Sequence, residues 1–175
     1  MAHTPGAPLA AVGRIRGPAS GRDPDPMKVV LDELSKQIIE QLQQDGRRSY
    51  ASIGKAVGLS EAAVRQRVQR LIEVGAMQIV AVTDPMTLGF RRQTMVGIRC
   101  SGDLERIASE LVGMQEIDYV VITAGSFDLL IEVVCEDDDQ LLEILGRVRV
   151  LPGVTTTETF VYLRLCKQTY SWGTR

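Results

Sequence analysis

The chain has 175 residues, 45% of them hydrophobic and 24% charged, with a formal net charge of −2, as expected of an ordinary globular protein of one or two domains. No apolar run approaches the roughly 18 residues of a membrane span, and no signal peptide is recognisable, so we expect a cytoplasmic protein with no membrane partner. The only histidine is His3, and the three cysteines lack metal-ligand spacing, which argues against metal sites, disulfides and histidine-based catalysis.

The first 27 residues predict a disordered N-terminal tail. Residues 1–26 hold five of the seven prolines and four of the sixteen glycines, without any hydrophobic periodicity. Such a segment buries too little apolar surface to offset the entropy lost on ordering. At the other end, residues 169–175 are interpreted as a C-terminal tail.

Residues 28–75 show the pattern of three short helices. Apolar residues recur at helical spacing from Leu31 to Leu42, and Asp45-Gly46 ends this helix. Ser49 and Ser60 are candidate N-caps of the next two helices, and Gly58 can take the positive φ of the turn between them. The third helix is predicted from Glu61 to about Val74, ended by Gly75, with a buried stripe made of Val64, Val68, Leu71 and Ile72.

The charge of this region favours a helix-turn-helix that binds DNA. Residues 47–70 carry six basic residues and one acidic residue, a net charge of +5, whereas residues 91–175 carry a net charge of −4. A basic block joined to an acidic one is typical of a DNA-binding module next to a separate partner domain. A plain three-helix bundle with a solvated basic face would share the apolar stripe, but it does not explain this near-exclusion of acidic residues.

The third helix is the candidate recognition helix. With Val64 at the centre of its buried side, the residues that point outward are Ala62, Ala63, Gln66, Gln69 and Arg70, flanked by Arg65 and Arg67. Small side chains permit close approach to a major groove, glutamine can pair with adenine, and arginine can pair with guanine. Free N–H groups at a helix start can bind phosphates. The residues at the predicted helix starts that could contact phosphates are Arg47, Arg48, Ser49 and Ser60.

A second domain is predicted over residues 93–168, after a linker over 76–92 that carries its own strand at Met77–Val82. The order strand, helix, strand, strand, helix, strand is typical of the ferredoxin-like βαββαβ fold. The strands are expected at Gln93–Cys100, Tyr119–Thr123, Leu129–Cys135 and Thr155–Leu165. The fold class is therefore α+β, a winged-type helix-turn-helix domain followed by a ferredoxin-like domain.

The acidic run Glu136–Asp139 allows two interpretations. Carboxylates are ligands for hard cations. The run also comes directly before a helix, where negative charge is favoured by the helix dipole. We favour the helix start.

Three sequence runs together resemble the Lrp/AsnC (feast/famine) family of transcription regulators. They are LDELSKQIIEQLQQDGRRSYASIGKAVGLSEAAVRQRVQRLIEVGAMQ, TAGSFDLLIEV and LPGVTTTETFVYL, and the likeness extends over roughly residues 30–168. The resemblance implies a DNA-binding regulator, not an enzyme, that forms dimers assembling to octamers and reads a pseudo-palindromic operator. It implies no cofactor, but an amino-acid effector bound between the C-terminal domains of neighbouring subunits.

Carried over by position, the implied effector-binding residues are Ile122, Gly125, Ser126, Asp128, Phe160, Val161 and Tyr162. Backbone N–H groups near Gly125 could bind a carboxylate, and Asp128 could bind an α-ammonium group. Gly125–Asp128 could equally be a plain hairpin turn, because glycine and aspartate both favour turns. For Phe160–Tyr162 we favour strand packing or dimer contacts over direct ligation.

Other functions stay open at this point. The protein could be an architectural DNA-wrapping protein without effector control, or its C-terminal domain could only dimerise. Sirohaem decarboxylases share the same two-domain plan, but they are thought to depend on pocket histidines, and His3 is far from that region in sequence.

Overall fold

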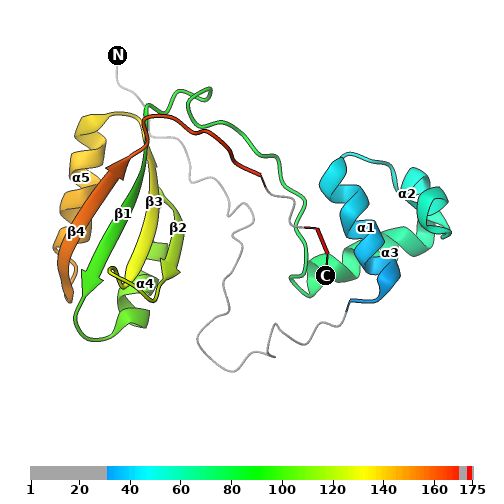
Figure 1. Cartoon of the computed structure of the whole chain (residues 1–175), viewed down its shortest axis with the longest axis horizontal. Helices are drawn as coiled ribbons and strands as arrows, with labels where there is room; N and C mark the ends of the chain where they lie inside the picture. The colour runs from blue at the N-terminus through cyan, green and yellow to red at the C-terminus, as the bar shows by residue number, and fades with distance from the viewer. Residues whose placement is uncertain (1–30, 170–172, 175) are drawn as a thin grey trace, which may run out of the picture. The chain divides into compact units, whose positions relative to one another are not determined.

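Figure 1 presents the computed structural model, which describes residues 31–169, 173 and 174. The described residues form two compact units, with the division between Ala81 and Val82 and with Thr169, Gly173 and Thr174 grouped with the first unit. The tail predicted over residues 1–27 lies outside the described residues. Within them, no helix is long and apolar enough to cross a membrane.

The first unit is a three-helix bundle of α1 (Glu33–Gln44), α2 (Tyr50–Val57) and α3 (Glu61–Glu73). The predicted N-caps are confirmed, because Ser49 accepts the Ser52 N–H and Ser60 accepts the Ala63 N–H. Residues from all three helices form the core, namely Ile38, Leu42, Ile53, Val64 and Val68. The predicted burial of Ile72 is wrong. It is 43% exposed, because it lies about 80° around α3 from Val64, beyond the stripe that α1 and α2 cover.

The turn between α2 and α3 depends on two glycines. Gly58 has a φ of 75°, the left-handed conformation that the sequence predicts. The Leu59 N–H donates to the Gly54 carbonyl at 2.9 Å, and Leu59 packs on the core. A Cβ on Gly54 would lie 2.5 Å from the Leu59 carbonyl oxygen, so only glycine allows this close approach of α2 to the turn.

The strand predicted over Met77–Val82 does not form, and that prediction is wrong. A strand needs a neighbouring strand to pair with along its edge. Among the described residues no strand pairs with this run, and the Met77 N–H donates instead to the Leu71 carbonyl at the end of α3. The apolar side chains Ile79, Val80 and Val82 of this run are 45%, 57% and 59% exposed. No β-hairpin wing therefore follows α3 among residues 31–169.

The second unit has the predicted βαββαβ order (Figure 1). Its strands are β1 (Arg92–Cys100), β2 (Ile117–Ile122), β3 (Leu129–Cys135) and β4 (Val154–Val161), and its helices are α4 (Leu104–Val112) and α5 (Asp138–Arg149). The antiparallel sheet has the order β2-β3-β1-β4. β4 ends at Val161, earlier than predicted, and its last pair with β1 joins Val161 to Thr94.

The two helices cover one face of this sheet (Figure 1). The core of this unit lies between the sheet and the helices. It is formed by residues of α4 and α5 together with Val96, Ile98, Ile131 and Val133 of the sheet. The alternating residues point to the helix-free side, here called the outer sheet face. It is made of Gln93, Met95, Gly97, Arg99, Tyr119, Val121, Leu130, Glu132, Val134, Thr156, Glu158 and Phe160.

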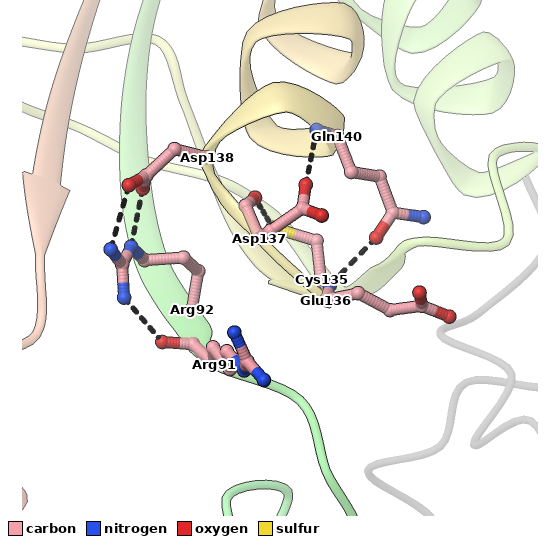
Figure 2. A network of polar contacts seen from close by, with 7 residues as sticks. All are labelled: Arg91, Arg92, Cys135, Glu136, Asp137, Asp138 and Gln140. Atoms are coloured by element: carbon pink, nitrogen blue, oxygen red, sulfur yellow. Dashed lines mark hydrogen bonds and ion pairs between the residues drawn. The ribbon is translucent and has the colours of Figure 1, made fainter.

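The acidic run begins a helix, as the sequence predicts. Asp137 caps α5 by accepting the Gln140 N–H at 2.9 Å, and the Gln140 side chain accepts the Glu136 N–H at 2.7 Å (Figure 2). Arg92 of β1 binds the Asp138 carboxylate through two nitrogens, one of them at 2.7 Å. This hydrogen bonding lowers the pKa of Asp138. Here the carboxylates start a helix and anchor it to β1.

Candidate DNA-binding and effector sites

The outward face of α3 is arranged as the sequence predicts. Ala62, Gln66, Gln69 and Arg70 are exposed and Ala63 is half-buried. The Gln69 amide donates to the Glu73 carboxylate at 2.9 Å. Among the described residues, the side chains of Gln66 and Arg70 have no hydrogen-bonding or ionic partner in the chain. These two side chains are therefore the ones on this face best placed to bind base edges.

The flanking Arg65 is exposed and partly engaged within the domain. It pairs with Glu61 one turn earlier at 2.7 Å. Its guanidinium also lies over the Tyr50 ring, 5.4 Å from the centroid. Exposed pairs of this kind are weak, so Arg65 can exchange them for a phosphate oxygen.

Arg67, the other flanking arginine, has a structural role that the sequence reasoning missed. Its Nη1 lies 2.6 Å from the Asp32 carboxylate and 3.2 Å from the Ser35 hydroxyl. Asp32 also caps α1 by accepting the Ser35 N–H at 2.9 Å. Hydrogen bonds from Ser35 and then from Arg67 lower the pKa of Asp32 from 3.8 to about 2. An aspartate just before the first helical residue was the signal for this cap.

The start of α2 brings together Arg47, Arg48 and Ser49. The Arg47 N–H donates to the Asp45 side chain at 2.9 Å and the Arg48 N–H to the Asp45 carbonyl at 3.0 Å, which sets the turn before the helix. An open hollow of about 380 Å³ lies here. It is lined by Gly46, Arg47, Arg48, Ser49, Tyr50 and Ile79. Two arginines and a helix N-terminus facing open space can bind a phosphate group.

Ile122 at the end of β2 and three residues of the turn between β2 and β3 are among the implied effector-binding residues. Ile122, Gly125 and Ser126 are exposed, and Asp128 is half-buried. The Asp128 carboxylate accepts the Cys100 N–H at 2.7 Å, and its own N–H donates to the Ile98 carbonyl at 2.9 Å. Asp128 thus holds the turn against β1 with one carboxylate oxygen.

The remaining implied residues lie on β4 or just after it. Phe160 lies on the outer sheet face, whereas Val161 points to the opposite side, since it is paired with the buried Thr94. Burial and a hydrogen bond with Glu132 raise the pKa of Tyr162 to about 12. Phe160 contacts the turn edge-on, with 6.2 Å between its ring centroid and that of Phe127.

Comparison with known proteins accounts for both units. The model of the AsnC-type helix-turn-helix domain matches residues 31–72, and a model described as a C-terminal dimeric alpha+beta barrel domain matches residues 90–175. The HTH-type transcriptional regulator FL11 of Pyrococcus horikoshii is 32% identical over 145 residues, which are 82% of this chain and 96% of that protein. The chain belongs to the Lrp/AsnC family of transcription regulators.

Other Lrp/AsnC proteins extend this comparison. The proline dehydrogenase transcriptional activator of Rhizobium radiobacter is 31% identical, covering 79% of this chain and 93% of its own. Two solved structures share the fold. The leucine response regulatory protein of Mycobacterium tuberculosis has a TM-score of 0.75 at 23% identity, covering 82% of this chain and all of that one. A Neisseria meningitidis regulator in complex with L-Met has a TM-score of 0.70 at 21% identity, covering 81% of this chain and 95% of that one.

Proposed function

We propose that this Lrp/AsnC regulator binds operator DNA in a sequence-specific way and is controlled by an amino acid. The observation that carries the DNA part is the exposed face of α3. There Gln66 and Arg70 lie without partners among the described residues, beyond the small side chains Ala62 and Ala63. A glutamine and an arginine on such a face can read adenine and guanine in a major groove.

Contacts to the DNA backbone come from the start of α2 in this proposal. Arg47, Arg48 and Ser49 surround an open hollow, and Ser60 begins the recognition helix. Such contacts fix the register of a protein on the duplex and carry no sequence information. Their removal therefore weakens binding to operator and random DNA alike, and makes binding less dependent on salt.

The protein acts as a dimer in this proposal, with a second copy covering the outer sheet face. That face is free of helices and carries the apolar side chains Met95, Val121, Leu130, Val134 and Phe160 beside the charged Arg99, Glu132 and Glu158. The description of the family's C-terminal domain as dimeric supports this. A two-fold dimer reads a pseudo-palindromic operator, and we propose further assembly of dimers to an octamer.

The proposed effector is an amino acid bound at the β2–β3 turn and the end of β4, between neighbouring subunits. The Neisseria meningitidis regulator forms a complex with L-Met, which supports an amino acid as the class of ligand. In this chain Gly125 and Ser126 leave backbone groups exposed at the turn, and Asp128 has one carboxylate oxygen beyond its bond to Cys100. The remaining proposed contacts are Ile122, Phe160, Val161 and Tyr162.

Fluorescence anisotropy tests this function. The purified chain is titrated on labelled DNA from upstream of its own gene and on random DNA, each with and without a pool of the twenty amino acids. We expect preferential binding to the upstream DNA, changed by the pool. Equal affinity for both DNAs would favour an architectural DNA-wrapping protein, and no binding to either at low salt would overturn the proposal. Preferential binding that no amino acid changes would overturn the effector part alone.

A further inference from the structure

Gly97, in the middle of β1, is buried although it faces the helix-free side of the sheet. The ring of Phe127, from the β2–β3 turn, covers it. A Cβ added to Gly97 would lie 2.7 Å from two carbons of that ring. Real Cβ atoms do not come this close to other atoms, so the ring can occupy this position only because residue 97 is a glycine.

Two further side chains of the outer sheet face hold the Phe127 ring. The Arg99 guanidinium lies 5.7 Å from its centroid, a cation–π distance. Phe160 of β4 contacts it edge-on, with an angle of 78° between the ring planes. The ring is therefore in contact with both β1 and β4, although its own residue lies in the turn between β2 and β3.

Hydrogen bonds from backbone and side-chain groups hold the turn at the same place. Asp128, the next residue, binds the Cys100 N–H and the Ile98 carbonyl of β1. The Thr123 hydroxyl donates to the Phe127 carbonyl at 2.6 Å. Between these anchors Ala124, Gly125 and Ser126 are exposed. The contacts that Phe127 and Asp128 make with β1 thus determine where the exposed part of the turn lies.

We propose that Phe127 seated on Gly97 is a latch that couples the effector turn to the dimer face. This rests on the proposed function, in which the turn binds the effector and a second copy covers the outer sheet face. Phe127 is a positioning residue that belongs to both surfaces. A ligand that moves the turn moves the ring, and the ring changes the face that the partner covers. Effector binding and dimer stability are then linked reciprocally.

A double-mutant cycle on Gly97 and Phe127 tests the latch in the full-length chain. Gly97→Ala adds the methyl group that displaces the ring, Phe127→Ala removes the ring, and the double variant relieves the clash. Gly146→Ala is the matched control, because a Cβ there meets nothing within 4 Å and Gly146 lies on α5, outside both the turn and the outer sheet face. Circular dichroism verifies the fold of each variant. The readouts are the hydrogen exchange of the Cys100 amide by NMR and the dimer dissociation constant by sedimentation.

We expect Gly97→Ala and Phe127→Ala each to speed exchange of the Cys100 amide and to weaken the dimer, by about tenfold or more. The double variant should then show nearly the same amide exchange and dimer dissociation constant as Phe127→Ala alone. Such non-additive effects are expected of two residues in direct contact. Folded, dimeric Gly97→Ala protein with wild-type exchange and association would overturn the latch, and so would additive effects. A wild-type chain that stays monomeric at all concentrations would instead contradict the dimer of the proposed function. If the variants change hydrogen exchange of the Cys100 amide in such a monomer, Phe127 has a structural role in the turn but does not couple the turn to a dimer face.

Discussion

The Arg67 guanidinium of α3 binds the Asp32 carboxylate at the start of α1, with 2.6 Å between Nη1 and Oδ2. The same carboxylate caps α1 through the Ser35 N–H. One side chain therefore begins the first helix and ties the recognition helix to it. Arg67 flanks the DNA-facing side of α3, yet this contact directs it into its own domain.

Replacing Asp32 with Asn should make the stability of the helical domain less dependent on pH. Since folding lowers the pKa of Asp32 from 3.8 to about 2, the carboxylate stabilises the fold fully above about pH 5. This contribution is lost as the pH falls through the interval between the two pKa values, where the unfolded chain takes up the proton first. Asparagine can still cap the helix. Thermal unfolding of both proteins from pH 7 to pH 2 should thus give a difference in melting temperature that shrinks on acidification. A constant difference would contradict the role of this charge.

Arg70 and Arg67 should respond differently to replacement by alanine. Arg70→Ala is expected to weaken operator binding by roughly 1–3 kcal/mol while leaving the melting temperature unchanged, as for a residue that contacts a base. Arg67→Ala should lower the melting temperature, because it leaves Asp32 without its ionic partner. Anisotropy titrations on operator and random DNA, beside thermal unfolding, separate the two. Unchanged operator affinity in folded Arg70→Ala protein would exclude Arg70 as a base-reading residue.

Ser60→Ala should destabilise the helix-turn-helix by about 1 kcal/mol, the usual cost of losing an N-cap. The Ser60 hydroxyl oxygen accepts the Ala63 N–H at 3.2 Å, and alanine offers no acceptor. Ser60→Asp restores an acceptor and is the matched control for stability. Urea unfolding followed by circular dichroism gives the free energies, and equal stability of all three proteins would mean that this cap contributes nothing.

Asp128→Asn should abolish the response to the effector and leave basal DNA binding intact. The asparagine side-chain oxygen can still accept the Cys100 N–H, so the turn keeps its place while losing the charge that would bind an α-ammonium group. Asp128→Ala, which loses both, should in addition speed exchange of the Cys100 amide. If Asp128→Asn responds at the wild-type effector concentration, Asp128 is a turn residue and not a ligand.

Tyr162 should titrate near pH 12. Its raised pKa, caused by burial and by Glu132, means that the folded chain retains the proton which the unfolded chain loses near pH 10. The contribution to stability is therefore present below pH 10 and lost between about pH 10 and 12. Ultraviolet difference titration of the wild type against Tyr162→Phe isolates this residue. Glu132→Gln should lower its pKa, and an unchanged titration curve would show that Glu132 has no part in the shift.

Local signals predicted most of the fold because each depends on neighbouring residues. The serine caps at 49 and 60 and the positive φ of Gly58 follow from residue type and position in the turn. The order of strands and helices follows from the spacing of apolar residues. The strand at Met77–Val82 was wrongly predicted because side-chain pattern alone says nothing of whether a hydrogen-bonding partner is present.

The candidate sites were harder to predict because they depend on contacts between residues far apart in the chain. Arg67 was counted among the DNA-facing residues, but its partner Asp32 lies 35 positions earlier. Phe127 was passed over beside Asp128, because its contact with Gly97 depends on how the turn folds back over the sheet. Helical periodicity places a side chain on a face, whereas only the folded chain reveals what that face meets.

Gly54 determines how α2 packs against the turn, whereas other residues form the exposed face of α3. Any other residue at position 54 would push against the Leu59 carbonyl oxygen, 2.5 Å from the new Cβ, and so change the angle between α2 and α3. Gln66 and Arg70 carry no such constraint, since neither packs in the core of the bundle. In the proposed function, exchanging these two exposed side chains would therefore change the target sequence and leave the packing of α2 against α3 as it is.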